Sequence, residues 1–304
     1  MISVGRILEG AFSVLRENLV AVAIWGGIYF AFNIAFTLVM SPVIRHSFGP
    51  GVSVNDTAEL MSAAIPIWLL SLLLGVVGVI LYTASMRSVL RPDTRGIAFL
   101  RLGLDELRML GLCLLFGIAG FALLLAASLI TGLFLGSVAA STESVLLRAI
   151  LSLLVGLVLF GTAAFFIIRF SLAFPLTLHR GAFAIGEAWT RSRGHFWKLF
   201  GAALVVTLIG LVASVAVNLV TAGSHFADLL ATLGDASAAD DGTSVQVVLP
   251  QKAEAGSFSM LVFLQSIGGG AVAAVWIALS GGSAATAARL LVEDEFSDAE
   301  DVFG

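Results

Sequence analysis

The stretch AIPIWLLSLLLGVVGVILYTASM, Ala64–Met86, contains 23 residues and not one charged side chain. A helix needs roughly 20 apolar residues to cross about 30 Å of hydrocarbon, so this stretch predicts a membrane span. The rest of the chain has the same character, because 59% of its 304 residues are hydrophobic and only 12% are charged. Soluble domains carry about 25% charged residues. The sequence therefore predicts that lipid surrounds most of the chain.

Working outward from this stretch, five further apolar segments are long enough for the same role. Because the bilayer core has no water, each of these segments must satisfy its backbone internally, as a helix does. The apolar segment nearest the N-terminus, 19–40, has 22 residues, too many for the apolar part of a signal peptide. We therefore expect it to stay in the mature protein. The sequence predicts an all-α, polytopic bundle of six transmembrane helices, in one membrane domain over residues 1–291. The expected spans are 19–40, 64–86, 109–138, 149–168, 199–220 and 260–280.

The distribution of Lys and Arg predicts the orientation of the spans. Of the 16 basic residues, 13 fall in the N-terminal arm, the connections after spans two and four, and the C-terminal segment. Six spans place these four segments on one side. The three opposite connections hold one basic residue each, Arg45, Arg148 and Lys252. Basic loops stay in the cytoplasm, so both termini are predicted to be cytoplasmic.

Amphipathic helices are expected in front of three spans, lying in the membrane interface with their apolar side toward lipid. Before span five, Glu187 precedes Arg191 by four residues, the favourable order for an ion pair on a helix. Residues 11–19 also align with residues 188–196, and the segment 99–110 has a similar pattern before span three. We predict three units, each an interfacial helix followed by a transmembrane hairpin. The apolar positions of the first unit are Val4, Ile7, Leu8, Ala11, Phe12 and Leu15, and the residues that fall on one side of the helix in the third are Ile185, Ala188, Trp189, Ser192 and Phe196.

The segment 169–197 carries a more specific pattern: an arginine ends a span, a proline follows, and a run of small, basic and aromatic residues leads into the next span. These residues are Arg169, Pro175, Ala188, Arg191, Ser192, Gly194 and Trp197. The pattern resembles the membrane domain of the glycerophosphoryl diester phosphodiesterase membrane-domain family and related bacterial inner-membrane proteins. The resemblance implies a multi-pass protein of a bacterial inner membrane.

The triplet His179-Arg180-Gly181 lies in the same segment, and H-R-G is part of the phosphodiesterase signature of some relatives. That signature also needs a downstream P-E-N-T and further acidic metal ligands, whereas here AFAIGEAW follows, with Glu187 the only nearby carboxylate. A catalytic barrel needs about 250 residues, and about a dozen follow Leu291. Metal-assisted hydrolysis requires several oxygen ligands around the ion. We therefore expect no enzyme activity, no metal and no cofactor, and interpret the triplet as a basic interfacial loop.

Two groups of residues are candidates for binding. Basic and aromatic residues after span four are predicted at the level of anionic phospholipid headgroups: Arg169, Arg180, Arg191, Arg193, Trp197 and Lys198. For Arg169, structural anchoring is the first interpretation and a lipid phosphate contact the second. Three amides lie inside spans, Asn33, Asn218 and Gln265. Such amides join helices, or they line the substrate path of a transporter.

Glycines within the spans, Gly132 and Gly136 in span three and Gly268–Gly270 in span six, are predicted to let helices approach closely. Between spans five and six, residues 222–259 are expected to form a short helix over 225–233 followed by flexible polar chain. The segment 292–304 has six acidic residues and no basic one, and predicts an extended, flexible cytoplasmic tail.

Two functions are consistent with these features. The first is a non-enzymatic membrane protein that organises or binds lipid, or docks a partner protein or a second copy, through its basic loops. The alternative is a transporter of a small solute or a lipid, with its path at the amides. No stripe of Lys and Arg with interleaved aromatic residues exists, so nucleic acid is not expected as a partner.

Overall fold

The computed structural model describes residues 2–48, 57–93, 96–141, 144–238 and 260–303. Helices and short connections make up all of these residues, with no strand among them, which confirms the predicted all-α class. The elements are α1 (Val4–Glu17), α2 (Leu19–Phe48), α3 (Thr57–Leu90), the 3₁₀ turn η1 (Ile97–Phe99), α4 (Leu104–Ser141), α5 (Val145–Phe170), α6 (Ala173–Arg180), α7 (Ile185–Arg191), α8 (Phe196–Ala238) and α9 (Met260–Phe303).

Within the described residues, six helices are long and apolar enough to cross a membrane: α2, α3, α4, α5, α8 and α9. Each of them contains most of one of the six segments that the sequence predicted as spans. Together with the composition, these helices indicate a membrane protein.

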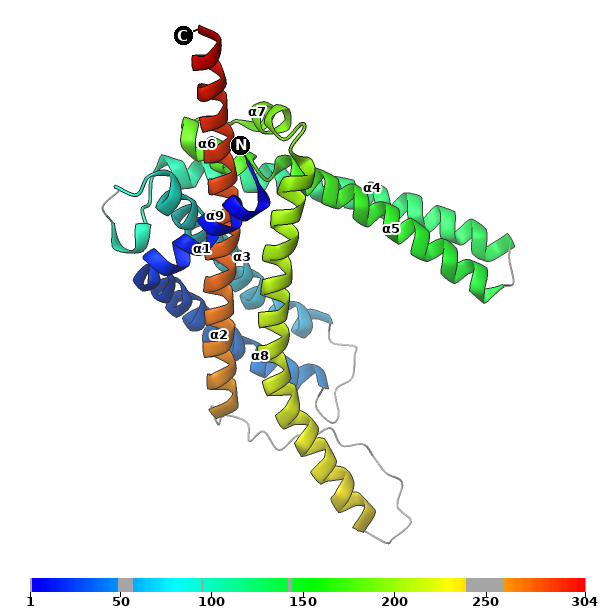
Figure 1. Cartoon of the computed structure of the whole chain (residues 1–304). Helices are drawn as coiled ribbons and strands as arrows, with labels where there is room; N and C mark the ends of the chain where they lie inside the picture. The colour runs from blue at the N-terminus through cyan, green and yellow to red at the C-terminus, as the bar shows by residue number, and fades with distance from the viewer. Residues whose placement is uncertain (1, 49–56, 94–95, 142–143, 239–259, 304) are drawn as a thin grey trace.

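Helix α9 is the centre of the fold, with α1, α2, α3 and α8 packed around it (Figure 1). Glycines allow the close approach that the sequence predicted for Gly268–Gly270. A Cβ atom on Gly270 would lie 2.7 Å from the carbonyl oxygen of Gly26 on α2, and one on Gly268 would lie 3.0 Å from Val217 on α8. At Gly270 the two backbones are in contact and leave no room for a side chain, so the α2–α9 pair depends on glycine there.

The α4–α5 hairpin stands apart from this core and projects sideways from it (Figure 1). In the most apolar window of each of its two helices, no residue is buried. A Cβ atom on Gly132 or Gly136 would meet nothing within 4 Å, so the prediction of close helix packing at this pair was wrong within the chain. A G-x-x-x-G pattern lets a second helix approach closely, but only the tertiary structure decides whether a second helix lies there.

The predicted amphipathic helix before the first span exists as α1, but its apolar face does not point to lipid. Ile7, Ala11 and Val14 are buried, and a Cβ atom on Gly282 of α9 would lie 3.1 Å from Ala11. The helix therefore packs across α9 as part of the core, and Phe12, expected on the apolar face, is exposed. The free energy gained by burying this face comes from protein packing rather than from contact with the bilayer.

The alignment of residues 11–19 with 188–196 corresponds to real helix boundaries. Leu19 and Phe196 occupy equivalent positions and are the first residues of α2 and α8. Ala11 and Ala188 are also equivalent, and both are fully buried. The expected helix over 99–110 is not a separate element, because only η1 is present before α4, which begins at Leu104 and continues into the span. A separate short helix thus precedes two of the three hairpins, α1 before α2 and α7 before α8.

Two helices are longer than the sequence suggested. Helix α9 continues to Phe303, so the acidic segment expected as extended, flexible chain is helical instead. Helix α8 continues to Ala238 and incorporates the short helix expected over 225–233. A helix already formed extends at little cost, since each added residue gains one backbone hydrogen bond. The polar chain expected over the remainder of the loop lies outside the described residues from 239 to 259.

Candidate functional site

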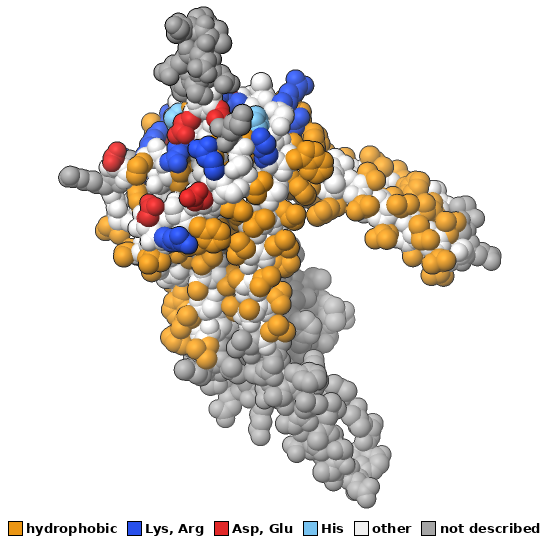
Figure 2. All heavy atoms as spheres, in the orientation of Figure 1, with side chains coloured by type: hydrophobic (Ala, Val, Ile, Leu, Met, Phe, Trp, Pro, Cys, Tyr) orange, Lys and Arg blue, Asp and Glu red, His pale blue; other side chains and the backbone are white. Residues whose placement is uncertain are grey.

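On the face that Figure 2 shows, the charged side chains of the described residues gather at one end of the molecule. They lie over α1 and the neighbouring ends of α8 and α9, whereas hydrophobic side chains cover the surface beyond them. Several segments that are far apart in sequence therefore meet in space. They are the segments that the distribution of basic residues predicted on one side of the membrane. We call this region the charged end; it includes α1, the C-terminal ends of α3 and α9, α6 and α7.

Arg169, at the end of α5, joins that helix to α7. Its Nη1 donates to the carbonyl oxygen of Trp189 and to Oγ of Ser192, each at 3.2 Å. Its guanidinium carbon lies 4.8 Å from the ring centroid of Trp189 and 5.4 Å from that of Phe165. Such cation–π contacts strengthen when water is excluded. Arg169 therefore anchors α5 to α7 within the protein, in line with the first of its two interpretations.

Arg180 and Arg191 share one carboxylate. Nη2 of Arg180 lies 3.0 Å from Oε1 of Glu187, and Nε of Arg191 lies 2.8 Å from the same oxygen. Burial alone would raise the pKa of Glu187, but the hydrogen bonds and charges of the two arginines outweigh burial and hold its pKa below the usual value. The predicted Glu187–Arg191 pair is confirmed. Its bridging by Arg180 was not foreseen, because the two residues lie on different helices.

The other basic and aromatic candidates face outward. Arg193 and Lys198 are exposed, and within the described part of the chain neither makes an ion pair or a side-chain hydrogen bond. Trp197, between them, is 77% exposed. Gly194 has φ +80°, a left-handed conformation that favours glycine and turns the chain from α7 into α8. The outcome is an exposed basic and aromatic corner at the start of α8.

The His179-Arg180-Gly181 triplet forms the end of α6. Gly181 adopts φ +65° and its N–H donates to the carbonyl oxygen of Thr177 at 2.9 Å, which is the usual glycine termination of a helix. His179 and Arg180 lie in the last turn, where positive charge is favourable next to the free carbonyl groups. Among the described residues, no three His, Cys, Asp or Glu side chains come together in a way that would hold a metal ion.

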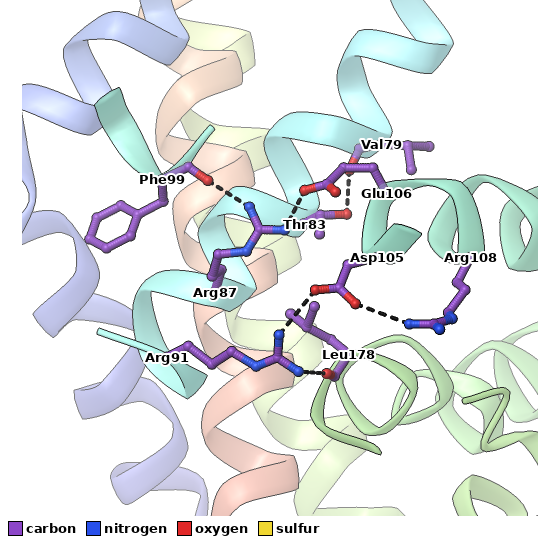
Figure 3. Close-up of polar contacts among 9 residues, drawn as sticks. All are labelled: Val79, Thr83, Arg87, Arg91, Phe99, Asp105, Glu106, Arg108 and Leu178. Atoms are coloured by element: carbon purple, nitrogen blue, oxygen red, sulfur yellow. Dashed lines mark hydrogen bonds and ion pairs between the residues drawn. The ribbon is translucent and has the colours of Figure 1, made fainter. Parts of the chain in front are cut away.

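A polar cluster next to α6, with a buried ion pair at its centre, was not predicted from the sequence (Figure 3). Arg87 of α3 and Glu106 of α4 form an ion pair, with 2% and 6% of each residue exposed. Beside it, Arg91 lies 3.0 Å from Asp105, which also holds Arg108 at 3.3 Å. Nη2 of Arg91 donates to the carbonyl oxygen of Leu178 at 2.7 Å. The cluster thus joins the core, the base of the hairpin and α6.

The signal for this cluster was present in the sequence. Arg87 and Arg91 are four residues apart, on one face of a helix, and Asp105 and Glu106 occupy the first turn of α4, where carboxylates favour the helix dipole. For the arginines between α3 and α4, the sequence predicted only a location on the cytoplasmic side. A count of both signs of charge would have suggested that some of the basic residues are neutralised within the protein.

The turn before α4 is held in an uncommon conformation. Ala98 and Phe99 have φ of 56° and 58°, which costs roughly 1–2 kcal/mol for each residue other than glycine. Nε1 of Trp25, a residue with no exposed surface, donates to the carbonyl oxygen of Ala98 at 3.1 Å. Nη1 of Arg87 donates to that of Phe99 at 2.7 Å. Two buried donors from α2 and α3 therefore fix this turn.

The three intramembrane amides are brought together only in part. Asn33 donates to the carbonyl oxygen of Tyr29 at 2.9 Å, and its amide nitrogen lies 3.6 Å from the position of a Cβ atom on Gly269. On the α8 side, Asn218 and Gly269 line one cavity of about 300 Å³, with Ser214 and Trp276 among its other residues. Gln265 is exposed and does not line that cavity.

Comparison with protein-family models, with curated proteins and with solved structures finds no match to this chain. The resemblance of residues 169–197 to a membrane-domain family therefore stays a prediction. The interpretation of the site rests on its residues and their geometry.

Proposed function

We propose that the chain is a non-enzymatic, multi-pass protein of a bacterial inner membrane that binds anionic phospholipid headgroups at the cytoplasmic leaflet. The observation that carries the proposal is the corner formed by Arg193, Trp197 and Lys198 at the start of α8. Its two cations lack partners among the described residues, and its indole is exposed where the apolar span begins. Basic side chains next to an interfacial tryptophan attract lipid phosphates, at about 1 kcal/mol for each charge.

The lipid test uses the full chain in nanodiscs that contain phosphatidylglycerol or phosphatidylcholine. Lipid retained through mild extraction is measured by native mass spectrometry. We expect the wild type to retain phosphatidylglycerol preferentially, and Arg193→Gln or Lys198→Gln to reduce that preference about fivefold. Arg148→Gln is the matched control, because it removes one charge from the far end of α5. An equal loss in all three variants, or no preference in the wild type, contradicts the proposal.

Orientation is a second part of the proposal. The charged end faces the cytoplasm if basic segments are retained on that side. Reporter fusions in the connection between α3 and α4, and after α9, are expected to report the cytoplasm. Periplasmic exposure of either position would reverse the assignment.

A transporter is the second candidate, because Asn33 and Asn218 flank Gly269 from two different helices. Proteoliposomes that show solute or lipid movement, abolished by Asn33→Leu and unaffected by Arg193→Gln, would favour transport. A protein partner or a second copy of the chain at the charged end also stays a prediction. Crosslinking of the intact protein in its membrane would detect either one.

A further inference from the structure

A cavity of about 370 Å³ lies where α1 ends and α2 begins, and it is open to the surface. One wall consists of Arg16, Glu17, Asn18 and the first three residues of α2. The opposite wall is the turn at Ala98 and Phe99. Neither the amphipathic pattern nor the candidate residues of the sequence indicated this cavity, because its walls are about 80 residues apart in the chain.

The position of the cavity places it at the membrane boundary. The first apolar span begins at Leu19, directly after the charged residues Arg16 and Glu17. Leu19 and Val20 line the cavity and are 66% and 76% exposed, and because they are the first residues of an apolar span, we expect them to face the hydrocarbon of the bilayer. A cavity that is polar on one side and apolar on the other at this level matches the glycerol and headgroup region of a phospholipid.

The two charged side chains at the cavity, Arg16 and Glu17, have no partner of opposite charge among the described residues. Arg16 and Glu17 are exposed, and neither makes an ion pair or a side-chain hydrogen bond with any residue that the structure describes. Consecutive residues on a helix do not face each other, so these two cannot pair with one another. By contrast, Glu106, Asp105 and Glu187 at the same end each hold an arginine. The cavity thus offers one positive and one negative group to a ligand.

We propose that this cavity binds the headgroup of a zwitterionic phospholipid with a primary ammonium group. The phosphate lies toward Arg16, the ammonium donates hydrogen bonds to Glu17, and the acyl chains follow Leu19 and Val20. An anionic headgroup would satisfy Arg16 and be repelled by Glu17. A choline headgroup has the positive charge but no N–H to donate, so it makes a weaker contact with the carboxylate.

The opposite wall is already in place before a ligand binds. The carbonyl oxygens of Ala98 and Phe99 are held by Trp25 and Arg87, both buried, so this turn keeps its position without help from the lipid. A preformed wall reduces the entropy lost on binding. The side chains of Arg16 and Glu17 are the parts that become ordered.

The test measures lipid retained by the full chain during delipidation in detergent, by native mass spectrometry. The probes are phosphatidylethanolamine, phosphatidylcholine and phosphatidylglycerol with identical acyl chains. We expect the wild type to retain phosphatidylethanolamine over phosphatidylcholine. Glu17→Gln should weaken this preference roughly tenfold, the effect of losing one charge-assisted hydrogen bond. Arg16→Gln should reduce retention of both zwitterionic lipids at this site.

Arg193→Gln separates this inference from the proposed function, because Arg193 occupies the position equivalent to Arg16 in the second arm. It should lower phosphatidylglycerol retention and leave the preference for phosphatidylethanolamine intact. Equal retention of phosphatidylethanolamine and phosphatidylcholine by the wild type overturns the proposal. So does an unchanged preference in Glu17→Gln, or loss of the preference in Arg193→Gln. Both cavity residues are exposed, so the variants should fold, which size-exclusion chromatography verifies.

Discussion

The α4–α5 hairpin and the core around α9 have similar compositions and opposite surroundings. Both consist of long apolar helices that are rich in glycine. In the core, glycines contact other helices: Gly210 lies against Trp276, and Gly270 against the backbone of Gly26. On the hairpin, a Cβ atom on Gly117, Gly120 or Gly156 would meet nothing within 4 Å.

This difference shows that the ability of a segment to span a membrane and its ability to pack against another helix are separate properties. Hydrophobicity places a segment in lipid, and both regions have enough of it. Packing additionally requires a neighbour at the right distance, which the core helices have and the hairpin lacks outside its base. Arginine contacts attach the hairpin there, among them Arg87 to Glu106 on α4 and Arg169 of α5 to α7. Its other surfaces are left for lipid.

The largest expected effect tests the glycine contrast directly. Gly270→Leu should prevent formation of the folded monodisperse protein, at a cost beyond about 3 kcal/mol, because the new side chain would overlap the backbone of α2. Gly120→Leu, on the hairpin, should leave stability unchanged. Thermal unfolding in detergent, followed by fluorescence size-exclusion chromatography, compares the two. Similar behaviour of the two variants would remove the distinction between core and hairpin.

The next effect concerns the joint between the two regions. Arg87→Met leaves Glu106 buried without its partner and should destabilise the protein by about 3 kcal/mol. Arg108→Met removes a half-exposed partner of Asp105 and should cost less than about 1 kcal/mol. The midpoint of unfolding in denaturant measures both. A double variant of Arg87→Met with Glu106→Met should recover most of the lost stability. If the double variant is as unstable as Arg87→Met alone, the unpaired carboxylate is not the cause of the loss.

A smaller effect is expected from the turn that leads into the hairpin. Trp25→Phe removes the N–H that donates to Ala98 and should cost about 1 kcal/mol, since a partly buried carbonyl group loses its donor. Trp68→Phe is the control, because that side chain is largely exposed on α3. Thermal unfolding of the two variants distinguishes them, and equal midpoints would show that the turn is not held by Trp25.

The smallest effect is a pH dependence at α7, next to the base of α5. The pKa of Glu187 is lowered in the folded protein, so its contribution to stability is fully present above the unfolded pKa of about 4.3 and is lost as pH falls through the folded pKa. Glu187→Gln should therefore reduce stability at neutral pH by less than about 1 kcal/mol and flatten the decrease below about pH 4.5. Unfolding midpoints measured over this range for both proteins test the sign. A greater acid sensitivity in the variant would contradict it.

The sequence predicted much of this fold because the relevant information is local. An uncharged segment such as Ala64–Met86 requires a helix in lipid wherever its neighbours lie, and Glu187–Arg191 form a pair because helix geometry alone places them together. The cluster of Arg87 with Glu106 was not predicted, since it depends on α3 and α4 meeting at one point.

By itself, the sequence determined the all-α class, the positions of six long apolar helices and the concentration of basic residues in alternate connections, because hydrophobicity and charge act residue by residue. Only the tertiary structure decided that the apolar face of α1 packs on α9, that Arg87 and Arg91 pair with carboxylates of α4, and that the hairpin stands apart. Each of these depends on which surface meets which, and an apolar face has the same pattern whether lipid or another helix covers it.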